Sequence, residues 1–221
     1  MKLIAKLSDK EVLNKETIVD ESKATSRKAA RAIVMDNKNK IAILSIPKYS
    51  YHKLPGGGIE DNEEIISALL REVKEETGCN IKIIEEIGLI KEYKGKYNQV
   101  QESFCYLSKV VGKKGKTNFT QDEKDAGFEI IWVNIKKAIN IFKEDKPSDY
   151  TAKFINKRDY LILLEGLKLL DALRKNWKLK SDNIMKIRKI LIEDKIKEKI
   201  YINMELLQKR LMKYYLIIHT L

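Results

Sequence analysis

One segment of this 221-residue chain carries acidic residues at a spacing that suits metal chemistry. Glu72, Glu75 and Glu76 lie three and four residues apart, so a helix through them projects their carboxylates onto one face. Such a cluster repels itself at neutral pH unless a cation neutralises it. Mg²⁺ and Mn²⁺ prefer oxygen ligands and share their coordination with substrate phosphates. The spacing therefore predicts a divalent-metal site on a helix.

A glycine-rich turn precedes this helix, in the run Leu54-Pro55-Gly56-Gly57-Gly58. Glycine permits backbone conformations that other residues avoid, and it lets the backbone approach an ion or a phosphate closely. Arg71 is placed to pair with Glu63 or with the acidic cluster, so its predicted role is to orient carboxylates. The turn and the helix together predict a site where phosphates meet a metal ion.

The segment from Gly57 to Cys79 resembles the Nudix box, Gly-x5-Glu-x7-Arg-Glu-U-x-Glu-Glu-x-Gly-U, in which U is a bulky aliphatic residue. Every fixed position is matched, and Cys79 takes the last aliphatic place as a small hydrophobe. The resemblance to the MutT-like Nudix hydrolases implies a magnesium- or manganese-dependent pyrophosphohydrolase. It implies that Gly57, through its carbonyl, joins Glu72, Glu75 and Glu76 as a metal ligand.

The resemblance implies attack by a metal-activated water on a phosphorus atom, with a general base completing the site. Glu72 is one candidate for the base. Glu123 or Asp122, in the loop before the last predicted strand, is the alternative. The predicted catalytic group is therefore Glu72, Glu75, Glu76 and Glu123, with Arg71 in support.

The sequence indicates the substrate-binding residues less specifically than it indicates the metal site. Aromatic residues before the glycine turn could stack on a base, lysines could meet phosphates, and tyrosines follow the box at a spacing known in some dinucleoside polyphosphate hydrolases. The favoured substrate is a (deoxy)nucleoside triphosphate or an oxidised deoxynucleoside triphosphate, with release of a monophosphate. ADP-ribose, dinucleoside polyphosphates and RNA 5′ ends are the alternatives. The residues considered are Tyr51, His52, Lys53, Gly56 and Gly57 for substrate binding, with Tyr49, Tyr93, Tyr97, Lys91 and Lys94 as weaker candidates.

Hydrophobic periodicity predicts the elements that hold these residues. A hairpin over 28–35 and 40–46 precedes the turn, a helix capped by Asp61 or Asn62 runs to Thr77, and two strands over 81–93 and 99–111 follow. The apolar residues at helical spacing in that helix are expected to face the core, namely Ile65, Ile66, Leu69, Leu70 and Val73. A loop over 112–127, a strand over 128–133 and helices over 134–142 and 149–177 complete the pattern. The fold class is α/β, a Nudix-type α/β/α sandwich with a mixed sheet and a helical C-terminal extension.

Composition limits the kind of partner and the cellular compartment that we expect for this chain. The net charge of +12 favours anionic partners, but lysines are spread along the whole chain, so a nucleotide is preferred to nucleic acid as the partner. Two cysteines without metal-ligand spacing fit a reduced, cytoplasmic protein, and no segment suits a signal peptide or a membrane span. We predict a Nudix domain over 1–178 and a basic helical extension over 179–221, with a homodimer through that extension left open.

Overall fold

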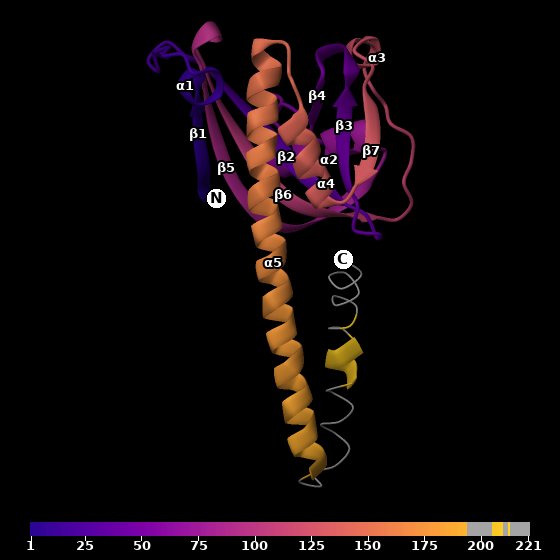
Figure 1. The fold of residues 1–221 in the computed structure, drawn as a ribbon. Coiled ribbons are helices and arrows are strands. Elements are labelled where there is room, and N and C mark those ends of the chain that lie inside the picture. Colours follow the sequence, from indigo (N-terminus) through magenta and orange to yellow (C-terminus); the bar gives the residue numbers. More distant parts are fainter. Residues whose placement is uncertain (194–204, 210–211, 213–221) are drawn as a thin grey trace. The chain divides into compact units, whose positions relative to one another are not determined.

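The computed structural model describes residues 1–193, 205–209 and 212. A seven-stranded mixed sheet lies at its centre, in the order β1-β5-β6-β2-β3-β4, with β7 paired to β3 (Figure 1). Strand β1 is parallel to β5 and β2 is parallel to β6, whereas the other pairs are antiparallel. The strands are β1 (Leu3–Ser8), β2 (Thr25–Met35), β3 (Ile41–Ile46), β4 (Tyr51–Lys53), β5 (Asn80–Lys94), β6 (Gln99–Val111) and β7 (Glu129–Val133).

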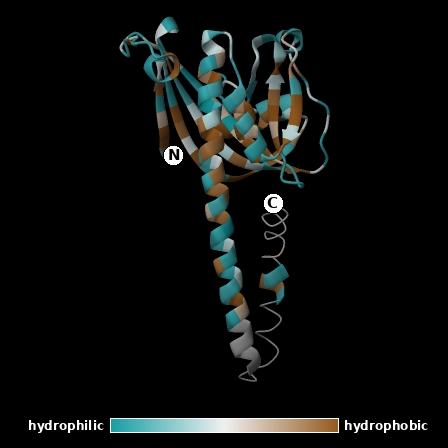
Figure 2. Ribbon diagram, in the orientation of Figure 1, coloured by the Kyte–Doolittle hydropathy of each residue, from teal (hydrophilic) through white to brown (hydrophobic). Residues whose placement is uncertain are grey.

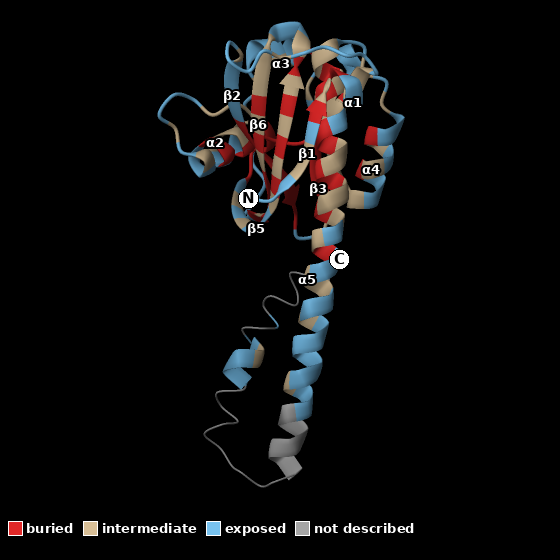
Figure 3. Ribbon diagram, turned by 90° about the vertical axis from the view of Figure 1, so that its left-hand side faces the viewer, coloured by how far each residue is buried: buried red, intermediate tan, exposed pale blue. Residues whose placement is uncertain are grey.

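Helices cover both faces of this sheet. Figure 3 shows α2 on one side of the strands, and α4 with the first part of α5 on the other. This arrangement confirms the predicted α/β/α sandwich. The helices are α1 (Asp9–Leu13), α2 (Ile65–Thr77), α3 (Gln121–Asp125), α4 (Ile135–Glu144) and α5 (Tyr150–Glu193), with short 3-10 turns at Pro47–Tyr49 and Gly95–Tyr97.

The central strand β2 separates the two layers of the core. Its alanines Ala30 and Ala32 pack against Leu69 and Val73 of α2. Ile33 points to the other face, where α5 comes so close that a Cβ on Gly166 would lie 2.2 Å from the Ile33 side chain. Alternate side chains of a strand point to opposite faces, so both faces of β2 are buried and both carry apolar residues. Figure 2 shows hydrophobic stretches in the strands of the sheet.

The predicted hairpin before the glycine turn has fewer ladder contacts than expected. Strands β2 and β3 pair only at Met35 and Ile41, next to the turn. Further along β2, the glycine turn takes the place of β3: Ala30 N donates to the Gly57 carbonyl and Ala32 N to the Pro55 carbonyl, each at 3.0 Å. The sheet therefore opens beside β2, and the glycine turn lies in that opening.

Three details of the predicted elements are wrong. Helix α2 begins at Ile65 with Glu64 as its N-cap, because Asn62 takes a left-handed conformation (φ 64°) in the turn that precedes it. Ile66 and Leu70 on α2 were expected in the core but are exposed, because the helix turns Leu69 and Val73 toward the sheet instead. The predicted loop over 112–127 contains α3, which Thr120 and Glu123 start with a capping box.

Helix α5 runs without interruption through the predicted domain boundary at 178/179. The chain divides into two compact units, residues 1–167 and residues 168–221. In the second unit, side chains over 171–186 are mostly exposed (Figure 3). Much of the predicted extension, residues 194–204, 210–211 and 213–221, lies outside the described residues, so the predicted division stays a prediction. Within the described part of the chain, no helix has the length and apolar character that crossing a membrane requires.

Candidate active site

The glycine turn brings Gly57 against the first glutamate of α2. A Cβ atom on Gly57 would lie 2.0 Å from Glu72 Oε2, so only glycine leaves room for this carboxylate. Gly56 is constrained differently: its φ is +129°, and a Cβ there would lie 2.1 Å from the Ala30 carbonyl oxygen. Gly56 is therefore required by its backbone conformation, whereas Gly57 is required because a side chain there would displace the Glu72 carboxylate.

We expect Gly57→Ala to lower kcat by about a hundredfold, because the new methyl group displaces the Glu72 carboxylate by more than an ångström. The displaced atoms are the end of a flexible side chain, so the free energy of unfolding should change by less than about 1 kcal/mol. Steady-state kinetics and thermal unfolding measure the two effects. Gly56→Ala is the matched comparison and should unfold at a clearly lower temperature. A Gly57→Ala enzyme with wild-type kcat would contradict the assignment of Glu72.

Glu76 is buried beneath the same turn. Its carboxylate accepts a hydrogen bond from Gly56 N at 2.7 Å and pairs with the Lys53 ammonium, which is itself largely buried. Burial raises the pKa of the Glu76 carboxyl, while Lys53 and the Gly56 amide act in the opposite direction. A buried carboxylate with a cation beside it is a site already organised for positive charge.

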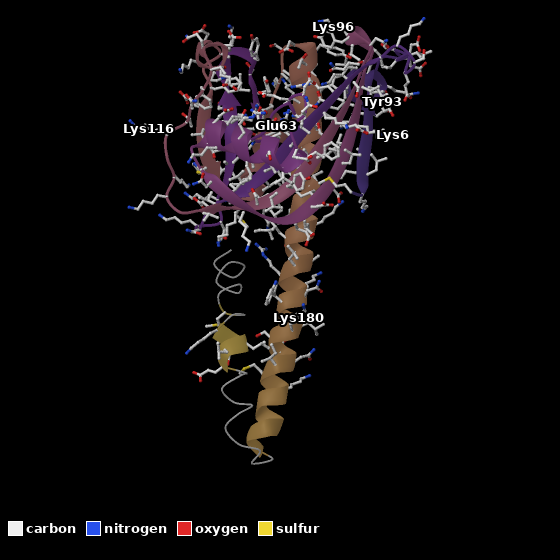
Figure 4. All side chains as sticks on the ribbon, turned by 180° about the vertical axis from the view of Figure 1, so that it is seen from behind. Lys6, Glu63, Tyr93, Lys96, Lys116 and Lys180 are labelled. Atoms are coloured by element: carbon white, nitrogen blue, oxygen red, sulfur yellow. The ribbon has the colours of Figure 1, made fainter. Side chains whose placement is uncertain are left out.

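Arg71 connects the glycine turn and Glu63 to the acidic residues of α2. Its guanidinium donates to both oxygens of Glu63 at 2.9 Å, to Glu72 Oε1 at 2.8 Å and to the Gly58 carbonyl at 3.3 Å. Glu75 is more exposed and lies 3.5 Å from the same guanidinium. The predicted orienting role of Arg71 matches this geometry. Figure 4, seen from the α2 side, places Glu63 near the middle of that face.

The three box carboxylates are divided among different cations in this structure. Glu72 and Glu75 face Arg71, whereas Glu76 faces Lys53. Within the described residues, no group of three or more His, Cys, Asp or Glu side chains gathers as a metal site requires. The donor chemistry nevertheless fits a hard divalent ion, because the Glu72 and Glu76 carboxylates lie against one turn and already attract guanidinium and ammonium groups. The Gly57 carbonyl accepts a hydrogen bond from Ala30 N in this structure.

The predicted substrate-binding residues before the turn have other contacts. Tyr51 is only 8% exposed and packs in a cluster with Ile46, Ala126 and Ala152, which does not favour base stacking by its ring. His52 Nδ1 lies 2.8 Å from Asp145 Oδ1. Of this group, Lys53, Gly56 and Gly57 contact or adjoin the box carboxylates.

Glu123 belongs to α3, and its carboxylate accepts hydrogen bonds from Thr120 N and Thr120 Oγ1 at 2.8 and 3.0 Å. Phe128 connects this segment to the site, because its N donates to the Glu123 carbonyl and the Lys53 ammonium lies 5.6 Å from its ring centroid. Glu123 therefore lies on a segment that borders the site, and its carboxylate caps a helix. Its catalytic role stays a prediction.

The weaker candidates are scattered. Tyr93 lies toward the β1 edge, away from Glu63, in Figure 4. Tyr97 packs edge-to-face on Tyr150 of α5, which the prediction did not anticipate. The remaining three are Tyr49, which is exposed, Lys91, which pairs with Glu102 at 2.7 Å, and Lys94, which is buried beside Glu92.

Sequence reasoning missed a layer of buried charges between the sheet and α5. Arg158 lies 3.4 Å from Glu92 Oε2 and donates to Asp159 Oδ1 at 2.7 Å. Asp159 in turn accepts a hydrogen bond from Leu54 N at 2.7 Å, at the start of the glycine turn. Arg31 lies on β2 in the same layer and is 4% exposed. A usable signal was present at Arg31, which interrupts an otherwise apolar run over 29–35.

Comparison with protein families matches the NUDIX domain to residues 25–154, more than half of the chain. The comparison with curated protein sequences finds no match. Solved structures with a similar fold include a MutT protein from Methanosarcina mazei Go1, 17% identical over 62% of this chain and 94% of that one, with a TM-score of 0.44. A Nudix-family hydrolase from Clostridium perfringens is 17% identical over 62% and 95% of the two chains, with a TM-score of 0.43. A UDP-X diphosphatase is 17% identical over 68% of each chain, with a TM-score of 0.45.

Proposed function

The chain belongs to the Nudix family and is a pyrophosphohydrolase, and from this we propose that it cleaves the diphosphate linkage of a nucleoside diphosphate derivative with the help of Mg²⁺ or Mn²⁺. One observation carries the proposal: Glu72 and Glu76 lie beneath the glycine turn, Glu72 against Gly57 and Glu76 hydrogen-bonded to Gly56 N. This arrangement combines anionic metal ligands with backbone that a phosphate chain can approach.

The residues around the turn have distinct proposed roles. The Gly57 carbonyl, Glu72, Glu75 and Glu76 would hold the ion, and Arg71 keeps Glu72 in place through its bonds to Glu63 and Gly58. A bound divalent ion would polarise phosphoryl oxygens and lower the pKa of a water molecule. Lys53 neutralises Glu76 in this structure. Its ammonium would be available to bind a substrate phosphate if Glu76 held a divalent ion.

Glu72 remains the preferred general base, because it sits directly against Gly57, where the phosphate chain approaches. Glu123 is the alternative. Its carboxylate must leave Thr120 to reach the substrate, which removes two hydrogen bonds from the cap of α3. Glu123→Gln should therefore change kcat little if Glu72 is the base.

The proposed substrate is a (deoxy)nucleoside triphosphate or an oxidised deoxynucleoside triphosphate, hydrolysed to a monophosphate in the cytoplasm. Burial of both cysteines as free thiols agrees with a reducing compartment. The alternatives are ADP-ribose, dinucleoside polyphosphates and the 5′ end of RNA.

A substrate panel tests the proposal. Purified full-length protein is incubated with nucleoside triphosphates, 8-oxo-dGTP, ADP-ribose, a dinucleoside polyphosphate and a 5′-triphosphate RNA, with Mg²⁺ or with EDTA. We expect monophosphate and pyrophosphate from a triphosphate in Mg²⁺ and none in EDTA. Hydrolysis that persists in EDTA, or in a Glu72→Gln variant, would refute the metal-site assignment.

A further inference from the structure

Arg31 is a buried arginine without a carboxylate partner. It is 4% exposed, and among the described residues no carboxylate lies within 4.0 Å of its guanidinium. Its one hydrogen bond runs from Nη1 to the carbonyl of the preceding residue, Ala30, at 3.1 Å, and its Nε has no partner. Burial and the nearby Arg158 together lower the pKa of Arg31 to about 10, although the carboxylates of Asp159 and Glu76 act in the opposite direction.

The nearby Arg158 shows how an arginine of the same layer is paired with carboxylates, although its Nη2 has no hydrogen-bond partner among the described residues. It is as buried as Arg31, but Glu92 and Asp159 both lie within 4.0 Å of its guanidinium. An unpaired charge in the interior is costly, and buried charges are ordinarily paired. Arg31 is therefore a buried cation without a contact ion pair among the described residues, because Asp159 and Glu76, whose charges act on it from a longer distance, are paired with Arg158 and Lys53.

Arg31 lies directly beside the glycine turn. Its Cα would be 2.9 Å from a Cβ atom on Gly56, and the Ala30 carbonyl that its guanidinium binds is the same oxygen that crowds Gly56. The amide of Gly56 binds Glu76, a predicted metal ligand. Thus the turn has anionic box residues on its α2 side and a buried cation on its α5 side.

We propose that Arg31 binds an anionic oxygen of the substrate's phosphate chain, from the α5 face of the sheet. The inference rests on the proposed function and deepens it, because it assigns a phosphate-binding residue outside the box. An arginine presents several donors in a planar fork that matches phosphate oxygens. Binding would give the unpaired Nε and the cation the partners that the free protein lacks.

The proposal makes a prediction that separates a ligand-binding arginine from a structural one. Arg31→Met removes an unpaired buried charge, so the variant should unfold about 2–4 °C above the wild type. The same variant should bind imidodiphosphate, a non-hydrolysable pyrophosphate analogue, about ten- to a hundredfold more weakly in Mg²⁺. Calorimetric titration and thermal unfolding of the full-length chain measure the two effects, and Arg31→Lys should recover part of the binding.

Two variants serve as controls. Lys82→Met removes one exposed positive charge from β5 and should leave imidodiphosphate binding unchanged. Arg158→Met removes a paired arginine of the same layer and should unfold at a lower temperature than the wild type. The opposite signs of the temperature shifts for Arg31→Met and Arg158→Met would support the proposal.

Wild-type affinity in Arg31→Met, no binding by the wild type, or a loss of thermal stability as large as that of Arg158→Met would overturn the inference. Failure of the proposed function is distinguishable. If the wild type hydrolyses the nucleotide panel while Arg31→Met binds imidodiphosphate normally, only the role of Arg31 is wrong. If the wild type binds imidodiphosphate through Arg31 but hydrolyses nothing, only the proposed activity is wrong.

Discussion

Glu76→Gln should lower kcat at saturating substrate and Mg²⁺ by at least about a thousandfold, which corresponds to about 4 kcal/mol of transition-state stabilisation. The amide keeps the size of the side chain but removes the charge that would bind the ion. It also leaves the Lys53 ammonium buried without a counter-ion. Steady-state kinetics over a range of Mg²⁺ concentrations, together with Mn²⁺ binding followed by electron paramagnetic resonance, would show the loss of both turnover and ion affinity.

Glu64→Gln is the matched control for this substitution. Glu64 is the exposed N-cap of the same helix, and its side chain makes no capping hydrogen bond, so kcat and Mn²⁺ affinity should stay at wild-type values. Turnover of Glu76→Gln within a factor of a few of the wild type would refute the metal role of Glu76.

A double variant separates the loss of stability from the loss of activity. Removing one partner of a buried ion pair destabilises a protein by about 3–5 kcal/mol, because the other charge is left unpaired. Lys53→Met combined with Glu76→Gln removes both charges, so thermal stability should return toward the wild type while activity does not. A double-mutant cycle, which compares the double variant with the two single variants, gives the interaction energy of the Lys53–Glu76 pair directly.

The acidic part of the site could be predicted from sequence because its geometry is local. Glu72, Glu75 and Glu76 belong to one helix, and adjacent glycines in the sequence indicate the turn that faces them. Arg71 reaches Glu63 within the same short segment. Helix periodicity and glycine sterics are short-range properties, so one sequence suffices to place these groups relative to one another.

The remaining part of the site depends on contacts between distant segments. Asp159 binds Leu54 N across 105 positions of sequence, and nothing in the pattern of α5 indicates which loop its side chain meets. The ring of Tyr51 was expected near substrate, but packing against Ala126 and Ala152 buries it. Strand order decides such contacts, and hydrophobic periodicity identifies strands without ordering them.

The same limit explains the hairpin that was only partly correct. Turn residues between β2 and β3 predicted an antiparallel pair, and one pair next to the turn is present. Strand β2 instead pairs along its whole length with β6, in parallel, which local turn chemistry cannot reveal. The consequence is functional, because the opening left beside β2 is where Gly57 meets Ala30 and where Arg31 comes close to the glycine turn.

Arg158→Met should lower the thermal unfolding midpoint by about 10 °C, since loss of a buried pairing costs about 3–5 kcal/mol and each kcal/mol shifts the midpoint of a chain this size by about 2–4 °C. The substitution leaves Glu92 and Asp159 in the interior without this arginine, although Lys94 stays 3.4 Å from Glu92. Asp159 also anchors Leu54 N, so KM and kcat should worsen together as the glycine turn loosens. Arg174→Met, which breaks an exposed pair with Asp171 on the same helix, should shift the midpoint by no more than a few degrees. Equal shifts in the two variants would mean that the charged layer beneath α5 does not hold the turn in place.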